Sequence, residues 1–402
     1  MLVSSHLLDD ILRARRYYAR HVTSFAERVV CSAARILFRR RLDIVSTSNG
    51  RTDALRIHAL LRQGGFSSSI VDPDSYRVRF RRPPLLIHSR EMRRIPKRYF
   101  LLQTRDLSDK SALDPGYAAV LKASVAVLDY STSNIEHLLA TGMNYKKIFY
   151  VPHGGDGWRF LARFLLAIDQ ITYSQFCKKT VEPSSPGKNQ NICLSLPETV
   201  ERRLAFSNPG GKFAFFDGLR HRYAWVGCGM SYKYLCQRAM ACGLDYLIVV
   251  EDDALFSGGF IDNLNVILSY LAATPYPWHV FSGFIAHLGA KTKVSRVDSY
   301  GGFDFVHINK LTSMVFNVYH KSVFGRISRW NEKNYHFYTN TIDRFLENWK
   351  ELKVVTTIPF LVGHKEELTS SIWNFENSKY NVMVEESIKR LSGLVHAFRM
   401  GE

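Results

Sequence analysis

The stretch LDYLIVVEDDALF, residues 244–256, decides how the second half of this chain is interpreted. The apolar residues 247–250 lead directly into three adjacent carboxylates, Glu251, Asp252 and Asp253. The apolar run predicts a buried strand, and acids at its carboxyl end would lie where open α/β sheets bind ligands. A divalent cation would neutralise these charges, and oxygen ligands suit Mg²⁺ or Mn²⁺. The alternative interpretation is an ordinary solvated acidic loop.

Strand and helix patterns alternate on both sides of this stretch. Upstream, the apolar strand patterns LDIVSTS, RYFLLQT, VAVLDYS and KIFYVPHGG are separated by helical patterns such as TDALRIHALLRQGG. This alternation predicts an α/β chain with a parallel sheet covered on both faces. We therefore expect two Rossmann-like domains, at residues 42–156 and 190–402, joined by a helix and a Pro/Ser/Gly/Asn-rich linker over residues 157–189.

Composition limits the partners of such a chain. The 402 residues exceed the usual size of one hydrophobic core, and 46% of them are hydrophobic. The formal net charge of +18 favours anionic binding partners, namely nucleic acid, anionic lipid or phosphorylated substrates. Because no helix-turn-helix, zinc-finger or RNA-binding aromatic signature is present, nucleic acid is not expected.

Residues 1–41 form a basic segment with apolar residues at helical spacing and nine arginines against three acids over residues 7–41. Two interpretations fit: an amphipathic helix on an anionic membrane surface, or a helix packed on the body with its arginines solvated. The six cysteines form no C-x-x-C pair, and there is neither a signal-peptide pattern nor a long apolar run. These features predict a cytoplasmic protein, with the inner face of the membrane as the site of any peripheral attachment.

The second half carries a family resemblance. The segments ICLSLPETVERR, VGCGMSYKYLCQRAMACGLDYLIVVEDDALF, LTSMVFNVYHKSVFGRI, TIDRFLE and VVTTIPFLVGHKEELTSSI resemble, in order, the signature of glycosyltransferase family 25, the lipopolysaccharide-type transferases, over roughly residues 190–375. The resemblance implies a GT-A fold and a metal-dependent inverting transfer of a hexose from a UDP-sugar. Galactose is the implied sugar, and the implied acceptor is a cell-surface or lipid-linked glycan such as lipopolysaccharide or capsule.

The resemblance also implies roles for single residues. Asp253 would be the direct metal ligand, Glu251 would assist through the ion or the ribose, and His364 would be a late metal ligand. His364 departs from the family pattern, which has an amide there, and a structural histidine is the alternative.

The donor and catalytic positions follow in the same way. Asp343 would be the general base that removes the proton of the acceptor hydroxyl, although a carboxylate at the start of a helix has the same pattern. The donor-binding candidates are Arg202, Arg203, Ser231 and Asp252, and a solvated pair on a helix is the alternative for the two arginines.

The first domain has a looser resemblance. ASVAVLDYSTSNIEHLLATGMNYKKIFYVPHGG is similar to the N-terminal half of GT-B-type glycosyltransferases, which suggests acceptor binding, scaffolding or a second active site. The basic stretch RVRFRRPPLLIHSREMRRIPKR, residues 77–98, would hold a phosphorylated lipid-linked acceptor, face the membrane, or guard an edge strand with charge. The rival function for the whole chain is non-catalytic glycan or polyanion binding.

Overall fold

The computed structural model describes residues 41–76, 83–108, 113–180, 190–372 and 375–401. The expected basic helical segment lies outside these residues except for its last residue, as does the arginine-rich start of the basic stretch, residues 77–82. No helix in the described part of the chain is long and apolar enough to cross a membrane.

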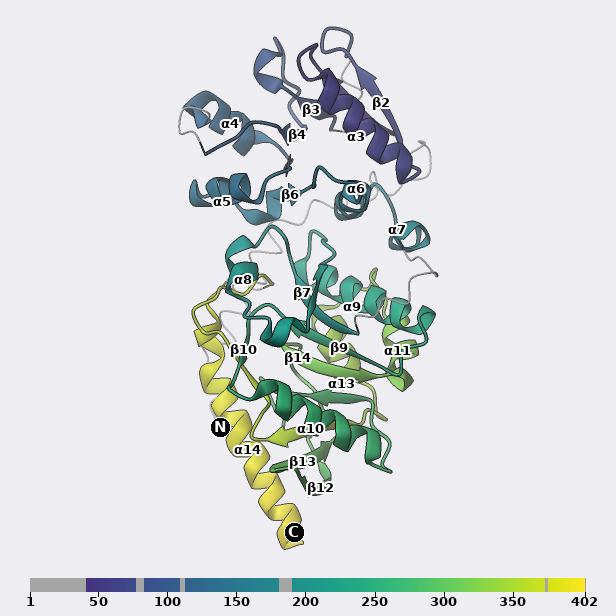
Figure 1. Ribbon diagram of the computed structural model, residues 1–402, viewed down its shortest axis with the longest axis vertical. Helices are drawn as coiled ribbons and strands as arrows, with labels where there is room; N and C mark the ends of the chain where they lie inside the picture. Colours follow the sequence, from purple (N-terminus) through teal and green to yellow (C-terminus); the bar gives the residue numbers. More distant parts are fainter. Residues whose placement is uncertain (1–40, 77–82, 109–112, 181–189, 373–374, 402) are drawn as a thin grey trace.

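A six-stranded sheet occupies the upper part of Figure 1 and is parallel throughout, in the order β2-β1-β3-β4-β5-β6. This confirms the parallel sheet that the alternating pattern predicted. The strands are β1 (Arg41–Ser46), β2 (Ser67–Val71), β3 (Leu85–Ile87), β4 (Phe100–Gln103), β5 (Ala126–Asp129) and β6 (Ile148–Tyr150). The accompanying helices are α3 (Arg51–Gln63), α4 (Pro115–Ala123), α5 (Thr132–Ala140) and α6 (Gly157–Ala167).

A second sheet of eight strands lies below it, in the order β12-β13-β15-β11-β14-β9-β7-β8. The strands are β7 (Asn191–Ser195), β8 (Ala214–Asp217), β9 (Tyr246–Glu251), β11 (Val280–Ser282), β12 (Val294–Tyr300), β13 (Phe303–Ile308), β14 (Phe316–His320) and β15 (Val354–Ile358). A separate antiparallel pair joins β10 (Ala254–Phe256) to β16 (Val362–His364). The helices are α7 (Tyr173–Thr180), α8 (Val200–Ala205), α9 (Ala224–Ala241), α10 (Phe260–Ala273), α11 (Lys321–Ser328), α12 (Phe337–Asn340), α13 (Ile342–Glu347) and α14 (Asn381–Met400).

This second sheet is mixed, which corrects the expectation that the acids follow a strand of a parallel sheet. Strand β9 is parallel to β7 but antiparallel to β14. The reversal follows from the β12–β13 hairpin, whose two-residue turn is Gly301-Gly302. Both residues have positive φ, +57° and +86°, as a tight hairpin turn of this length requires. These glycines therefore serve a turn.

Strand β9 is buried on both faces, which explains its unbroken apolar run. Leu247 and Val249 join the core that contains α9 and α11, whereas Ile248 and Val250 join the core that contains α10. Successive side chains of a strand point to opposite faces, so both faces need apolar residues. The carboxylates begin where this double burial ends, at Glu251.

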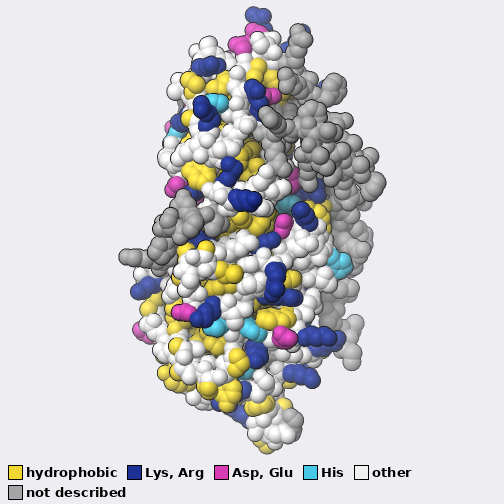
Figure 2. All heavy atoms as spheres, turned by 90° about the vertical axis from the view of Figure 1, so that its right-hand side faces the viewer, with side chains coloured by type: hydrophobic (Ala, Val, Ile, Leu, Met, Phe, Trp, Pro, Cys, Tyr) yellow, Lys and Arg dark blue, Asp and Glu magenta, His cyan; other side chains and the backbone are white. Residues whose placement is uncertain are grey.

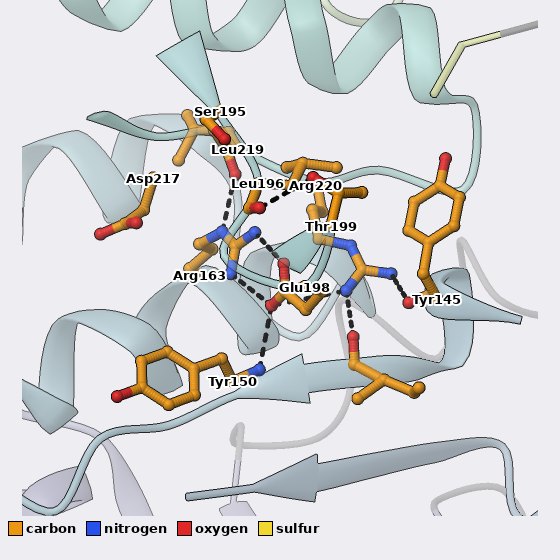
Figure 3. Close-up of polar contacts among 12 residues, drawn as sticks. Tyr145, Tyr150, Arg163, Ser195, Leu196, Glu198, Thr199, Asp217, Leu219 and Arg220 are labelled. Carbon is orange, nitrogen blue, oxygen red and sulfur yellow. Dashed lines mark hydrogen bonds and ion pairs between the residues drawn. The ribbon is translucent and has the colours of Figure 1, made fainter. Parts of the chain in front are cut away.

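Buried ions join the two sheets at the junction drawn in Figure 3. Glu198, between β7 and α8, is fully buried and receives both Nη atoms of Arg163 from α6, each at 2.7 Å. The backbone N–H of Tyr150 in β6 donates to the same carboxylate at 2.9 Å, and Arg220 lies 3.6 Å from it. Arg220 also donates to the carbonyl groups of Ile148 and Tyr145. The junction thus fixes the loop from which α8 begins.

Candidate functional site at the end of strand β9

Asp252 is held on both of its oxygens by protein donors. Ser195, the last residue of the neighbouring strand β7, donates from Oγ to Oδ2 at 2.7 Å. Arg202 of α8 donates to Oδ1 from Nε at 2.9 Å and from Nη2 at 2.5 Å. Because Asp252 is also 4% exposed, its carboxylate orients Arg202 and has little room for a ligand.

Asp253 differs because one of its oxygens has no partner. Oδ2 accepts from Asn377 Nδ2 at 2.9 Å and lies 3.1 Å from Arg202 Nη2. Oδ1 is buried and makes no hydrogen bond. An unsatisfied buried carboxylate oxygen costs free energy, so this atom is the natural position for a cation.

The electrostatics of the cluster favour added positive charge. Burial, followed by the charge of Asp253, raises the pKa of the Glu251 carboxyl to about 8, and burial also raises the pKa of Asp252. Burial alone would lower the pKa of the Arg202 guanidinium, but the charges of Asp253 and Asp252 raise it overall. The single guanidinium of Arg202 therefore pairs with two carboxylates, Asp252 and Asp253. Glu251 is a third acid beside them.

Asp343 approaches the same cluster from α13. Its Oδ1 accepts the backbone N–H of Arg344 at 2.8 Å. Burial raises the pKa of the Cys228 thiol on α9, and the charges of Glu251 and Asp343 raise it further. Both carboxylates are thus close enough to act on one thiol. The charge of Asp343 also acts on the Glu251 carboxyl, which lies more than 90 positions earlier in the sequence.

Two predicted site residues, Ser231 and Arg203, have internal partners in the structure. Ser231 is 1% exposed, accepts from the backbone N–H of Leu219 at 2.8 Å and donates to the carbonyl of Gly227 at 2.9 Å. Arg203 pairs with Asp217 at 2.8 Å and also donates from Nε to Ser195 Oγ at 3.4 Å, the hydroxyl that holds Asp252. The hydroxyl of Ser231 is therefore committed to the packing of α9, and Arg203 to the ends of β7 and β8.

His364 reaches the cluster indirectly. It lies opposite Ala254, the residue after Asp253, in the β10–β16 pair. Its Nε2 is 3.1 Å from the carbonyl oxygen of Asn377, whose amide in turn holds Asp253. A carbonyl partner requires Nε2 to carry the proton, which leaves Nδ1 as the nitrogen with a lone pair.

The described residues contain no group of three or more His, Cys, Asp or Glu side chains already arranged to hold a metal ion. Glu251, Asp253 and His364 are therefore not a preassembled ligand cage. Mg²⁺ in particular is commonly held by one or two carboxylates together with water and the phosphates of a substrate. The unpartnered Oδ1 of Asp253, with Glu251 beside it, fits that kind of site.

Sequence reasoning missed Ser195, Asn377 and Tyr145. Ser195 ends a buried strand next to β9, so the rule that singled out Glu251 would have found it. Asn377 lies in a short 3-10 helix 124 residues after Asp253, and no sequence signal links the two. Tyr145, beyond α5, donates from its hydroxyl to the carbonyl of Ser371.

The 369–371 loop consequently touches both halves of the molecule. Arg202 Nη1 donates to the carbonyl of Thr369 at 2.7 Å, while Tyr145 of the first half holds Ser371. The acidic cluster is thus built by the second half and bordered by the first. No protein-family model matches this chain, and no curated protein matches it either.

Proposed function

We propose that the chain is a metal-dependent inverting glycosyltransferase that moves a hexose from a UDP-sugar to a cell-surface glycan acceptor. The observation that carries the proposal is the buried, unpartnered Oδ1 of Asp253 in a cluster where, among the described residues, Arg202 is the only cation paired with Asp252 and Asp253. The mixed α/β second sheet is compatible with a GT-A fold, and the parallel first sheet with a Rossmann-like domain.

Asp253 would hold the cation, with Glu251 beside it and His364 Nδ1 as a further ligand. When bound, Mn²⁺ or Mg²⁺ would neutralise the diphosphate that leaves the sugar. Arg202, held by Asp252, would remain beside that diphosphate as a fixed positive charge.

Asp343 would act as the general base. Within the described part of the chain its carboxylate accepts only the Arg344 N–H, which leaves acceptor capacity for the proton of a sugar hydroxyl. Inversion follows if that hydroxyl oxygen attacks the anomeric carbon from the face opposite the diphosphate. Galactose as the sugar, lipopolysaccharide or capsule as the acceptor, and the cytoplasmic membrane face as the location rest on the family resemblance.

The test follows release of free UDP from a panel of UDP-sugars with Mn²⁺. Asp253→Asn should lower the rate at least 100-fold, and Asp343→Asn should lower transfer to an acceptor by about 10²–10⁴-fold, as expected for the loss of a general base. Asp245→Asn is the matched control. Asp245 precedes the amino end of β9 and forms only an exposed pair with Lys321, so this variant should keep full activity.

Equal rates in Asp253→Asn and Asp245→Asn would contradict the proposal. So would binding of UDP-sugars with unchanged affinity in Asp253→Asn when both proteins are saturated with Mn²⁺. Each variant needs the same unfolding temperature range as the parent chain for this comparison to hold.

The alternative is a non-catalytic glycan- or polyanion-binding protein, which the net charge of +18 favours. Figure 2 shows the Lys and Arg side chains of one face scattered among apolar and neutral surface, without a single continuous stripe. Salt-dependent binding of heparin or DNA that is unaffected by Asp253→Asn, together with no UDP release, would favour this alternative.

A further inference from the structure

An apolar groove of about 420 Å³ lies next to the acidic cluster. It is bounded on one side by β10 and β16 and on the other by α14, which runs along the edge of the second half in Figure 1. Its apolar lining includes Phe284, Phe360, Val362 and Val384. A groove of this volume is in the range that holds small ligands.

Large apolar side chains on both walls of the groove are exposed to solvent. Leu255 of β10 is 51% exposed and Ile388 of α14 is 44% exposed, and both line the groove. Leaving such side chains in water is unfavourable unless something covers them part of the time. Opposed apolar walls around an open volume therefore indicate a ligand with an apolar portion.

The groove is linked to the proposed metal site through shared contacts. His364 lines the groove, and its imidazole also contacts the carbonyl of Asn377, the residue whose amide binds Asp253. The backbone adds a second link, because Lys365 N–H donates to the carbonyl of Asp253 at 2.8 Å. A ligand seated in the groove would thus have one end close to the reacting atoms.

Charge at the groove narrows the class of ligand. The charged residues that line it, Glu366 and Glu385, are both acidic. Carboxylates repel a phosphate or carboxylate headgroup, so an anionic amphiphile is disfavoured there. An uncharged chain or ring attached to a sugar meets no such penalty.

We propose that this groove binds the uncharged apolar aglycone, an alkyl or similar hydrocarbon chain, of the glycosyl acceptor. The assignment of this ligand to the acceptor rests on the proposed function, whereas the binding of a hydrocarbon chain does not. The groove would select acceptors with an apolar group next to the sugar that receives the hexose.

The test is calorimetric titration of the full chain with n-alkyl β-glucosides carrying four, six and eight carbons, below their critical micelle concentrations and without donor. The Kd should fall roughly tenfold with each two-carbon extension, because burial of each methylene contributes a factor of about three to four. Ile388→Lys should abolish this dependence on chain length. Val382→Lys, on the same helix but outside the groove and 66% exposed, should retain it.

A Kd independent of chain length, or an unchanged dependence in Ile388→Lys, would overturn the proposal. A dimer seen by sedimentation velocity and dissolved by Ile388→Lys would also overturn it, in favour of a second copy of the chain. UDP release without acceptor reports on the enzyme alone and should be unchanged in Val382→Lys, which lies outside the groove. If chain-length-dependent binding is found in a protein that releases no UDP, the groove binds hydrocarbon but its ligand is not a glycosyl acceptor.

Discussion

Two buried carboxylate regions follow neighbouring strands of the same sheet, and they are neutralised in opposite ways. At the junction after β7, two guanidiniums, from Arg163 and Arg220, face one carboxylate, Glu198. At the end of β9, one guanidinium, from Arg202, faces two carboxylates with Glu251 beside them. The first region is complete within the protein, and the second lacks positive charge.

The pKa values of Glu198 and Glu251 follow the ratio of guanidiniums to carboxylates in each region. Burial alone would raise the pKa of Glu198, but Arg163 and Arg220 outweigh it and lower the pKa to about 2. Burial raises the pKa of Glu251 to about 8, and the neighbouring Asp253 adds to the shift. Burial raises both pKa values, so the number of opposite charges around each acid decides the direction of its net pKa shift.

The largest expected effect is at the complete region. Glu198→Ala leaves Arg163 and Arg220 buried without their carboxylate and should lower the free energy of unfolding by about 3–5 kcal/mol. Urea unfolding followed by circular dichroism measures this loss. The control is Glu332→Ala, which removes the partly exposed partner of Lys233 and should cost at most ~1 kcal/mol. Similar losses in the two variants would remove the basis of the comparison.

The next effect separates the two regions by their response to metal. Arg202→Met removes the only guanidinium paired with Asp252 and Asp253 among the described residues, and should destabilise the metal-free protein by about 2–4 kcal/mol. Mn²⁺ should recover part of this loss, because a cation replaces the missing charge. Thermal unfolding with and without Mn²⁺ tests it, and Glu198→Ala, which keeps the β9 site, should gain only as much as the parent chain. A gain in Arg202→Met no larger than that of the parent chain would contradict replacement of the Arg202 charge by the cation.

A smaller effect is expected from metal binding to the unaltered chain. Mn²⁺ at ten times its Kd should stabilise the folded protein by about 1.4 kcal/mol, and Asp253→Asn should abolish this gain. Differential scanning calorimetry over a range of Mn²⁺ concentrations measures both. Ca²⁺ at the same ionic strength controls for general screening. Retention of the full Mn²⁺ gain in Asp253→Asn would place the cation elsewhere.

The smallest effect is a pH dependence of opposite sign in the two regions. Folded Glu251 keeps a proton that the unfolded chain releases above pH ~4.5, so its contribution lowers stability as pH rises from about 4.5 to 8. Metal-free Glu251→Gln should therefore melt about 1–2 °C above the parent at pH 8, and the gap should close below pH 4.5. The stabilisation from Glu198 is present above pH ~4.5 and is lost as pH falls toward 2. A gap for Glu251→Gln that grows as the pH is lowered would show that the sign is wrong.

The sequence predicted the elements well where burial imposes a simple pattern. The apolar run of β9 and the strand–helix alternation of the first sheet both reflect double-sided burial, and the parallel sheet followed from them. The sequence pattern could not predict that β14 runs antiparallel to β9, because the alternation of apolar residues is the same in parallel and antiparallel strands.

The site was only partly predictable for a related reason. Glu251, Asp252 and Asp253 were found because they end an apolar strand. The hydrogen bonds that differentiate them come from Ser195, Arg202 and Asn377, on three distant segments. The tertiary fold decides which carboxylate oxygen receives a hydrogen bond from these segments. A local sequence pattern does not contain that information.

The ion cluster at Glu198 also limits how this molecule can be dissected. A fragment starting at residue 190 would lose Arg163 and the Tyr150 N–H, and the Glu198 carboxylate that now receives them would face water beside Arg220. The fragment would keep the acidic cluster but would lose the anchored start of the segment that carries Arg202. Recombinant work on either half is therefore best done on the intact polypeptide, with the two halves distinguished by point substitution.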